Sequence, residues 1–177
     1  RDEVALLMAH VDGAGELIWD DFSRACWRIV RRTVLGDAAR DDDEVTDLLA
    51  ALRRDANWAY LRRRRTDLRH RFIARLRKHL EAAEPGSLAA ILAATPADGS
   101  TRPAGQVPQW LFAFDAAGIA AFRALAMLAT HPEQAARARA ELAGLDLSRP
   151  QHLPYLRGCV LESLRLWPTT LAVLRDS

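Results

Sequence analysis

The sequence predicts a mainly α-helical protein with a small β fragment at its C-terminal end. Apolar residues recur at spacings of three and four positions over most of the 177 residues, which is the helical period, and no series of alternating apolar and polar residues indicates a sheet. Half of the residues are apolar, enough for an ordered core. Only residues 171–175 resemble the start of a strand, and a lone strand has no partner. We therefore expect an internal piece of a longer chain that forms a single partial domain over residues 1–177.

Composition limits the class of protein. Cys26 and Cys159 are the only two cysteines and both lie in helical patterns, which favours a reducing compartment over a disulfide framework. No signal or targeting motif follows Arg1, and the apolar run 110–114 ends at Asp115, so no membrane-spanning segment is expected. The net charge of +2 indicates nothing about partners. We expect a cytoplasmic protein with no membrane partner.

Helices are predicted through the first hundred residues. One predicted helix covers residues 20–36 and ends at Gly36. Its inner face carries Phe22, Trp27 (or Cys26), Val30 and Val34. The acidic run 41–44 suits a helix N-terminus and leads into Val45, Leu48, Leu49 and Leu52. A long helix from Tyr60 to about Leu80 carries basic residues on one side and, on the other, Leu61, Leu68, Phe72, Leu76 and Leu80. Ser87 caps a short helix over 88–93.

The sequence of the second half predicts a loop over 95–103 and a central helix over about 104–130. A helix over 132–143 follows, and Pro132 begins it. The last helix, 154–167, lies between Pro154 and Pro168. One face of this last helix carries Leu156, Val160, Leu164 and Trp167, and a second carries Gly158, Glu162 and Arg165. We expect both faces to be buried, although ion pairs at this spacing are also common on surfaces.

The centre of the long helix is rich in small residues. Ala117 and Ala121, four positions apart, leave one face without bulk, and Gly118 lowers helix stability by about 1 kcal/mol relative to Ala. Close packing of a second helix explains this pattern, and so does the approach of a flat ligand; packing is the favoured interpretation. Asp115 is either paired with an arginine of another helix, which is favoured, or functional.

The basic run 62–65 and the arginines that follow it favour a solvated helix face over a nucleic-acid site, because no aromatic residues interleave with them. We therefore expect no nucleic-acid partner. The five histidines do not cluster at metal-ligand spacing, and no metal site is expected in this chain.

Four short motifs follow one another along residues 110–175. They are Ala117-Gly118, then His131-Pro132-Glu133-Gln134, then the pair Arg137 and Glu141, then Glu162-Ser163-Leu164-Arg165 followed by Leu166-Trp167-Pro168. In this order they resemble the cytochrome P450 family, the haem-thiolate monooxygenases, and especially its soluble bacterial members. Residues 1–100 resemble the family only in their general helical pattern.

The resemblance implies roles for particular residues. Glu162 and Arg165 would form a buried structural pair on the haem side of the core. Ala117 and Gly118 would lie against the distal haem face, and Arg175 would pair with a haem propionate. The substrate pocket would be lined by Ala113, Phe114, Thr170 and Ala172.

Two departures from the family pattern stand out. The family's acid and threonine, which relay protons to the bound oxygen, are replaced here by Ala120 and Ala121. Three alternatives follow: substrate or water supplies the proton, peroxide replaces dioxygen, or the oxygenation differs from the usual one. Asp115 is not expected to replace the relay, because it points roughly opposite to Ala120 around the helix. The family's iron-ligating cysteine loop follows the Glu/Arg helix and is missing here; neither Cys26 nor Cys159 is expected to replace it.

The resemblance therefore implies part of a monooxygenase that oxidises a hydrophobic organic substrate at a haem iron, with dioxygen or peroxide, and with electrons from a ferredoxin-type or flavin partner. This piece alone is expected to be inactive. The alternative is a non-enzymatic all-α domain for ligand binding or protein interaction, in which the small-residue helix is a packing seam.

Overall fold

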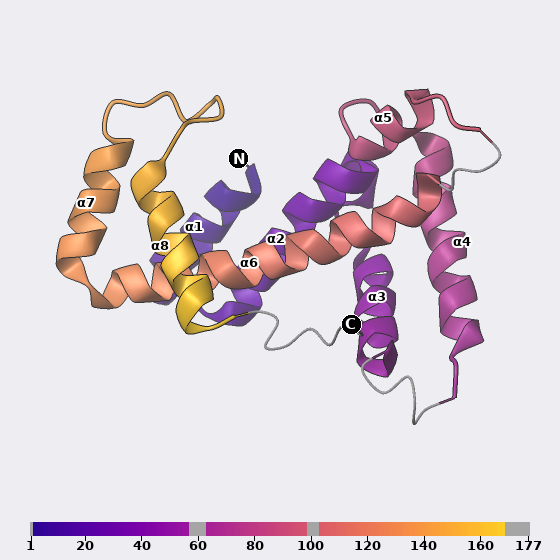
Figure 1. Cartoon of the computed structure of the whole chain (residues 1–177), viewed down its shortest axis with the longest axis horizontal. Coiled ribbons are helices and arrows are strands. Elements are labelled where there is room, and N and C mark those ends of the chain that lie inside the picture. The colour runs from indigo at the N-terminus through magenta and orange to yellow at the C-terminus, as the bar shows by residue number, and fades with distance from the viewer. Residues whose placement is uncertain (1, 57–62, 99–102, 169–177) are drawn as a thin grey trace, which may run out of the picture. The chain divides into compact units, whose positions relative to one another are not determined.

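The computed structural model describes residues 2–56, 63–98 and 103–168, and over these residues it is mainly helical and contains no strand (Figure 1). The prediction of a mainly α fold is confirmed. The strand predicted at 171–175 lies outside the described residues. Two compact units are distinguished, Arg1–Phe114 and Asp115–Ser177, and helix α6 contributes to both. That the chain forms a single partial domain of a larger fold stays a prediction.

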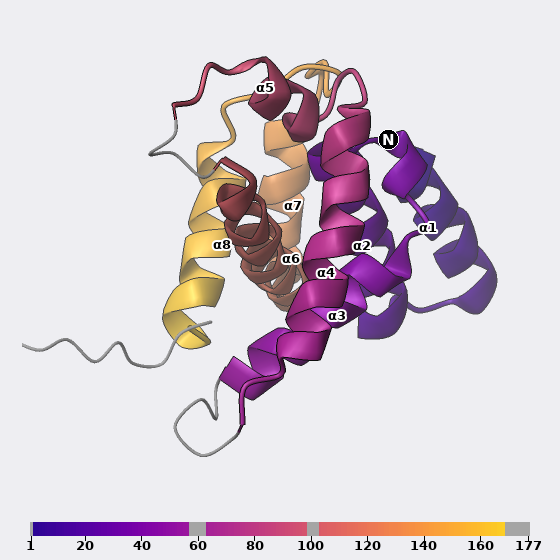
Figure 2. The same ribbon diagram turned by 90° about the vertical axis from the view of Figure 1, so that its right-hand side faces the viewer.

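The first unit contains five complete helices among its described residues and the start of a sixth. They are α1 (Asp2–Ala14), α2 (Trp19–Leu35), α3 (Asp43–Ala56), α4 (Thr66–Ala82), α5 (Leu88–Ala94) and the first turns of α6 (Val107–Thr130), with short 3₁₀ turns at Asp37–Ala39 and Pro103–Gln106. Helix α1 packs along α2, and α3 along α4 (Figure 2). The helix predicted from Tyr60 begins at Thr66, and residues 63–65 directly before it are not helical.

A single apolar cluster forms the core of this unit. The predicted inner faces of α2, α3 and α4 meet in it, and α6 adds its first turns. Its buried members are Val30, Val34, Leu35, Ala39, Val45, Leu48, Leu49, Phe72, Leu76, Val107 and Leu111. Cys26, Trp27, Leu52, Leu68 and Leu80 are partly buried against it. The sequence thus predicted which faces of these helices turn inward.

Gly36 ends α2, as predicted, and the structure shows why glycine is needed. Its φ of 113° lies in the region that side chains disfavour, and its N–H donates to the carbonyls of Arg31 and Arg32. A Cβ atom at Gly36 would come within 2.5 Å of the Glu84 carboxylate. That carboxylate accepts a hydrogen bond from the Ala38 N–H at 2.9 Å, so Gly36 makes room for a tie between the 3₁₀ turn and the α4–α5 connection.

Buried charges join the same turn to its surroundings. The Arg31 side chain is 1% exposed, donates to the Arg40 carbonyl and to Thr46 Oγ1 at 2.9 Å each, and approaches Asp43 Oδ1 to 2.6 Å. Glu3, which is 3% exposed, accepts hydrogen bonds from the guanidinium of Arg40. These charged contacts supplement the apolar core where α1, α2 and α3 meet.

The second unit contains the rest of α6, together with α7 (Pro132–Leu142) and α8 (Pro154–Leu166). All three elements agree with the predicted helices to within three residues at each end. Over the described part of this unit, 115–168, every buried residue is small. They are Gly118, Ala120, Ala124, Ala135, Ala138 and Ser163.

One helical stretch, 104–130, is long and apolar enough to cross a membrane by length and composition, a test that a core helix of a soluble protein also passes. Asp115 and Arg123 alone do not break the apolar average of α6, so the whole stretch passes although the apolar run 110–114 ends at Asp115. That the chain has no membrane-spanning segment stays a prediction.

Candidate functional site

Glu162 and Arg165 form the ion pair that the sequence predicts on α8. Arg165 Nε donates to Glu162 Oε2 at 2.8 Å and Nη2 donates to Oε1 at 2.6 Å, a bidentate arrangement across one helical turn. The guanidinium of Arg165 lowers the pKa of Glu162, so this carboxyl stays ionised. With both oxygens occupied, Glu162 is a fixed charge and a poor proton donor or acceptor.

The expected burial of this pair was wrong for the described residues. The side chains of Glu162 and Arg165 are 47% and 67% exposed. Leu156, Val160 and Leu164 are partly buried as the pattern predicts, but Trp167 is 49% exposed and Ser163 is the buried residue of the helix. Periodicity thus placed Leu156, Val160 and Leu164 correctly and Trp167 wrongly, and the face with Glu162 and Arg165 is exposed.

The N-terminus of α8 is capped from α7. Glu141 Oε1 accepts from the Tyr155 N–H at 2.7 Å and Oε2 accepts from the Leu156 N–H at 2.9 Å. The Tyr155 hydroxyl also donates to Gln134 Oε1. A carboxylate here satisfies free amides and complements the helix dipole. The sequence analysis used Gln134 and Glu141 only as members of motifs and did not predict this capping role.

Two contacts hold α8 against the second half of α6. Ser163 Oγ donates to the Ala120 carbonyl at 3.3 Å, with Ser163 fully buried and Ala120 3% exposed. Arg123 Nη1 donates to the Trp167 carbonyl at 2.6 Å, where α8 ends. Ala120 is therefore a packing residue between two helices. A small side chain at this position is required by the close approach of α8.

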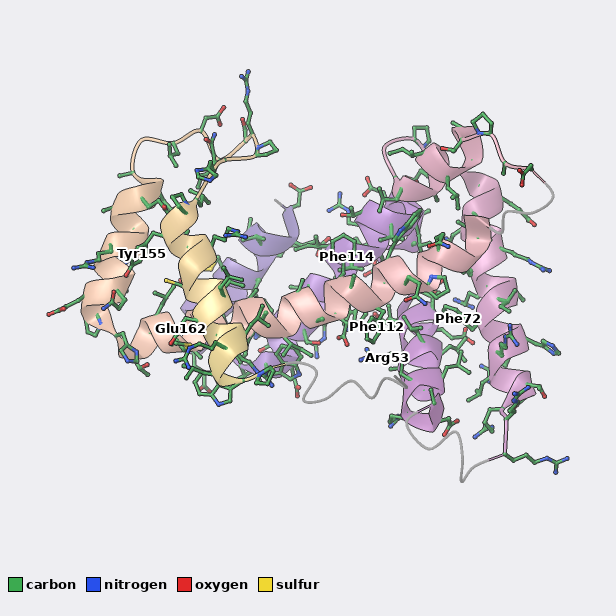
Figure 3. All side chains as sticks on the ribbon, viewed as in Figure 1. Arg53, Phe72, Phe112, Phe114, Tyr155 and Glu162 are labelled. Carbon is green, nitrogen blue, oxygen red and sulfur yellow. The ribbon has the colours of Figure 1, made fainter. Side chains whose placement is uncertain are left out.

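Two grooves open beside the Glu/Arg pair, both within the second unit. The first has a volume of about 340 Å³ and runs between α6, α7 and α8 (Figure 3 labels Tyr155 and Glu162 on its wall). Its lining is Met127, Leu128, His131, Gln134, Pro154, Tyr155, Gly158, Cys159 and Glu162. The second, of about 590 Å³, is bounded by Arg123, Ala126, Met127, Thr130, His131, Glu162, Leu166 and Trp167. Glu162 lies at the edge of both, in mostly apolar surroundings.

The small residues of α6 divide into two environments. Ala113 and Ala117 are exposed, whereas Gly118 and Ala120 are buried and Ala121 is intermediate. Phe114 is 36% exposed. The exposed alanines give a surface without bulk that a flat group could approach. The other predicted pocket and haem positions, Thr170, Ala172 and Arg175, lie outside the described residues.

Metal-binding side chains do not cluster among the residues that the structure describes. These residues contain no group of three or more His, Cys, Asp or Glu side chains that could hold a metal ion. Cys159 is partly buried at the first groove, and Cys26 packs against the core of the first unit. The feature of the described chain that suits a flat haem face is the bare surface at Ala113 and Ala117. That neither cysteine ligates a haem iron stays a prediction.

A contact that the sequence did not reveal joins α3 to α6 in the first unit. The guanidinium carbon of Arg53 lies 4.6 Å from the centre of the Phe112 ring (both are labelled in Figure 3). The two residues are far apart in sequence, so no local pattern could have paired them. Phe112 is 46% exposed and directly precedes Ala113 and Phe114, which the resemblance places at the substrate pocket.

Two arginines of α4 pair with residues of the acidic run 41–44. Arg71 contacts Glu44 at 2.8 Å, and Arg75 contacts Asp42 Oδ1 at 2.6 Å. These pairs neutralise part of the basic helix face. That the chain has no nucleic-acid partner stays a prediction.

No protein-family model, curated protein or solved structure matches this chain. The candidate site therefore depends on its own geometry and on the motif resemblance.

Proposed function

We propose that this chain is the central helical part of a haem-thiolate monooxygenase of the cytochrome P450 type. The observation that carries the proposal is the bidentate Glu162–Arg165 pair, formed on a helix that Glu141 caps and that Ser163 joins to α6. The motifs that resemble the family thus meet in one compact unit.

In this proposal each part of the chain has a limited task. Bound haem supplies the oxygen-transfer chemistry. Ala113 and Ala117 leave room for a flat group and a hydrophobic substrate, together with Phe114. Glu162 and Arg165 act as a rigid charged support, because neither is free to exchange a proton. We propose a ferredoxin-type or flavin redox partner, as the resemblance implies, and a cytoplasmic location, which the cysteine content favours.

The chain differs from the family most clearly at the two positions of the usual proton relay, which Ala120 and Ala121 occupy. Ala120 has no titratable group and its surface is covered, so it transfers no proton. We accordingly propose that water or substrate delivers protons, or that peroxide is the oxidant.

A second candidate is a non-enzymatic ligand-binding domain. The observation that favours it is the groove of about 340 Å³ between α6, α7 and α8, a volume typical of small-molecule pockets. The two candidates differ in whether a thiolate-ligated haem is present.

The deciding experiment is a spectrum of the reduced, carbon monoxide-treated full-length protein. We expect the red-shifted Soret band of thiolate-ligated haem, and its absence in the unmodified protein would overturn the proposal. Arg165→Ala is expected to lose the band. Arg149→Ala is the matched control, since Arg149 also pairs with an acid three residues away, Asp146, and lies on a solvated connection. Equal spectra for the two variants would refute the role given to Arg165.

A further inference from the structure

Helix α4 carries more positive charge than its neighbours in the fold neutralise. It lies beside α3 (Figure 1), and there Arg71 contacts Glu44 at 2.8 Å. Arg75 contacts both Asp42 and Glu44 at 2.6 Å. Glu44 thus lies between two arginines that are four positions apart and would otherwise repel each other. These two cations have a role within the fold.

Four other cations of α4 and the segment before it have no acidic side chain within ion-pair distance among the residues that the structure describes. They are Arg63 and Arg64, directly before the helix, and Arg77 and Lys78, in its last two turns, and all four are exposed. We call these four residues the basic surface of α4. Glu81, one turn beyond Arg77 and also exposed, offsets part of its charge.

The arginines before α4 are placed where the helix disfavours them. The first turn is the positive end of the helix dipole, so cations there lower the stability of the helix and acids raise it. Arg63, Arg64 and Arg65 are consecutive at this end, and the ion pair with Asp67 at 3.4 Å compensates Arg65 alone. A segment that served only as a solvated surface would gain stability from neutral or acidic residues here. A bound partner of opposite charge would compensate the remaining repulsion.

We propose that the basic surface of α4 is a docking site for an acidic protein, whose aspartate and glutamate side chains pair with these cations. The rise of about 1.5 Å per residue puts Arg64 and Arg77 about 20 Å apart along the helix axis. An extended acidic segment of about six residues spans this length. The inference does not depend on the proposed function, because none of these residues has a role in it.

The surroundings of the cations favour a protein over a lipid surface or a nucleic acid. The apolar side of α4, with Phe72 and Leu76, is buried in the core, so these side chains are not available to enter a lipid surface. Phe72 is also the aromatic residue of α4, and a buried ring cannot stack on a base. A carboxylate needs only the charge and the N–H donors that exposed arginines present.

The test measures the fluorescence anisotropy of a labelled oligoglutamate peptide added to the full-length protein. We expect binding at about 0.05 M salt that is lost at about 0.5 M salt, since exposed charges are screened. The double variant Arg77→Gln with Lys78→Gln should weaken binding about threefold to tenfold, the effect of losing two exposed ion pairs. Arg63→Gln with Arg64→Gln should weaken it to a similar extent.

The matched control removes two exposed arginines from the second unit. Arg139→Gln on α7 with Arg157→Gln on α8 lowers the net charge equally and should leave binding unchanged. Circular dichroism of each variant verifies that α4 remains folded.

Three results would overturn the inference. The first is that the unmodified protein does not bind oligoglutamate at low salt. The second is that the α4 variants bind it as tightly as the control variant does. The third is that duplex DNA, or vesicles containing phosphatidylserine, bind more tightly than the peptide at the same salt concentration, which would mean that the surface recognises phosphates and not the carboxylates of a protein.

Discussion

In residues 1–114 the buried side chains include Phe72, Leu35 and Leu111, whereas in the described residues 115–168 no buried side chain is larger than that of serine. Helix α6 takes part in both environments: Leu111 is fully buried near its start, and Ala120 and Ala124 are buried further along. The first unit is thus stabilised by apolar volume and the second by close backbone approach with specific polar contacts.

Small residues at a helix contact allow the two backbones to approach closely, but they bury less apolar area than large residues do. Alanine and serine at the α6–α8 contact allow a side chain of one helix to reach a backbone carbonyl of the other, as Ser163 reaches Ala120. The same packing buries little apolar area, so large residues stay at the surface, among them Leu125, Leu161, Leu166 and Trp167. Hydrogen bonds between helices therefore determine more of the helix packing in the second unit than in the first.

The largest effect is expected from truncating the core of the first unit. Leu35→Ala should lower the free energy of unfolding by about 2–5 kcal/mol, because Leu35 is 1% exposed and the cavity would be surrounded by other apolar side chains. Leu161→Ala in the second unit should change it by less than about 0.5 kcal/mol, since Leu161 is 49% exposed. Chemical denaturation of both variants measures the difference, and similar losses would show that the units are not stabilised differently.

The sequence predicted the first unit well because apolar volume leaves a periodic signal. Val30, Val34, Phe72 and Leu76 lie where the helical period put them. Ser87 caps α5 as expected, with the Ala90 N–H donating to its Oγ at 3.1 Å. Local patterns of this kind depend on residues close together in the chain.

The second unit was predicted less completely for the opposite reason. Its three helices were recognised, but the burial of Ser163 and the cap from Glu141 depend on contacts between elements, which single-helix periodicity does not encode. Glu162 and Arg165 show the same limit: spacing predicts that they pair, and only the neighbouring helices decide whether the pair is covered. The Arg53–Phe112 contact had no local signal at all.

A second prediction concerns acid, which should weaken the first unit through two carboxylates, the buried Glu3 and the partly buried Asp42. The hydrogen bond from Arg40 lowers the pKa of Glu3 below its ordinary value of 4.5. Burial acts to raise the pKa of Asp42, but hydrogen bonds from His79 and Arg75 outweigh it, and this pKa also lies below its ordinary value. Groups whose pKa is lowered on folding add stability above the ordinary value, and this stability is lost as the pH falls through the folded value.

The thermal midpoint, followed by circular dichroism between about pH 3 and pH 7, should therefore fall below about pH 4.5. Glu3→Gln should lower the midpoint at neutral pH and make the acid-induced fall shallower. Glu162→Gln is the control in the second unit: its pKa is lowered too, but the pair is exposed and screened, so the acid profile should barely change. An unchanged profile in Glu3→Gln would contradict the role of this carboxylate.

The smallest effect should come from removing one polar tie of the second unit. Glu141→Gln replaces the carboxylate that accepts from the Tyr155 and Leu156 N–H groups with an amide that has one acceptor oxygen and no charge. Losses of this kind at a helix N-terminus are about 0.5–2 kcal/mol. Because this unit has no large buried side chain among its described residues to compensate, the loss should appear locally, as faster amide hydrogen exchange over the first turns of α8. Glu133→Gln, at the exposed start of α7, should leave that exchange unchanged. Equal exchange in both variants would mean that α8 is held by its weak apolar face after all.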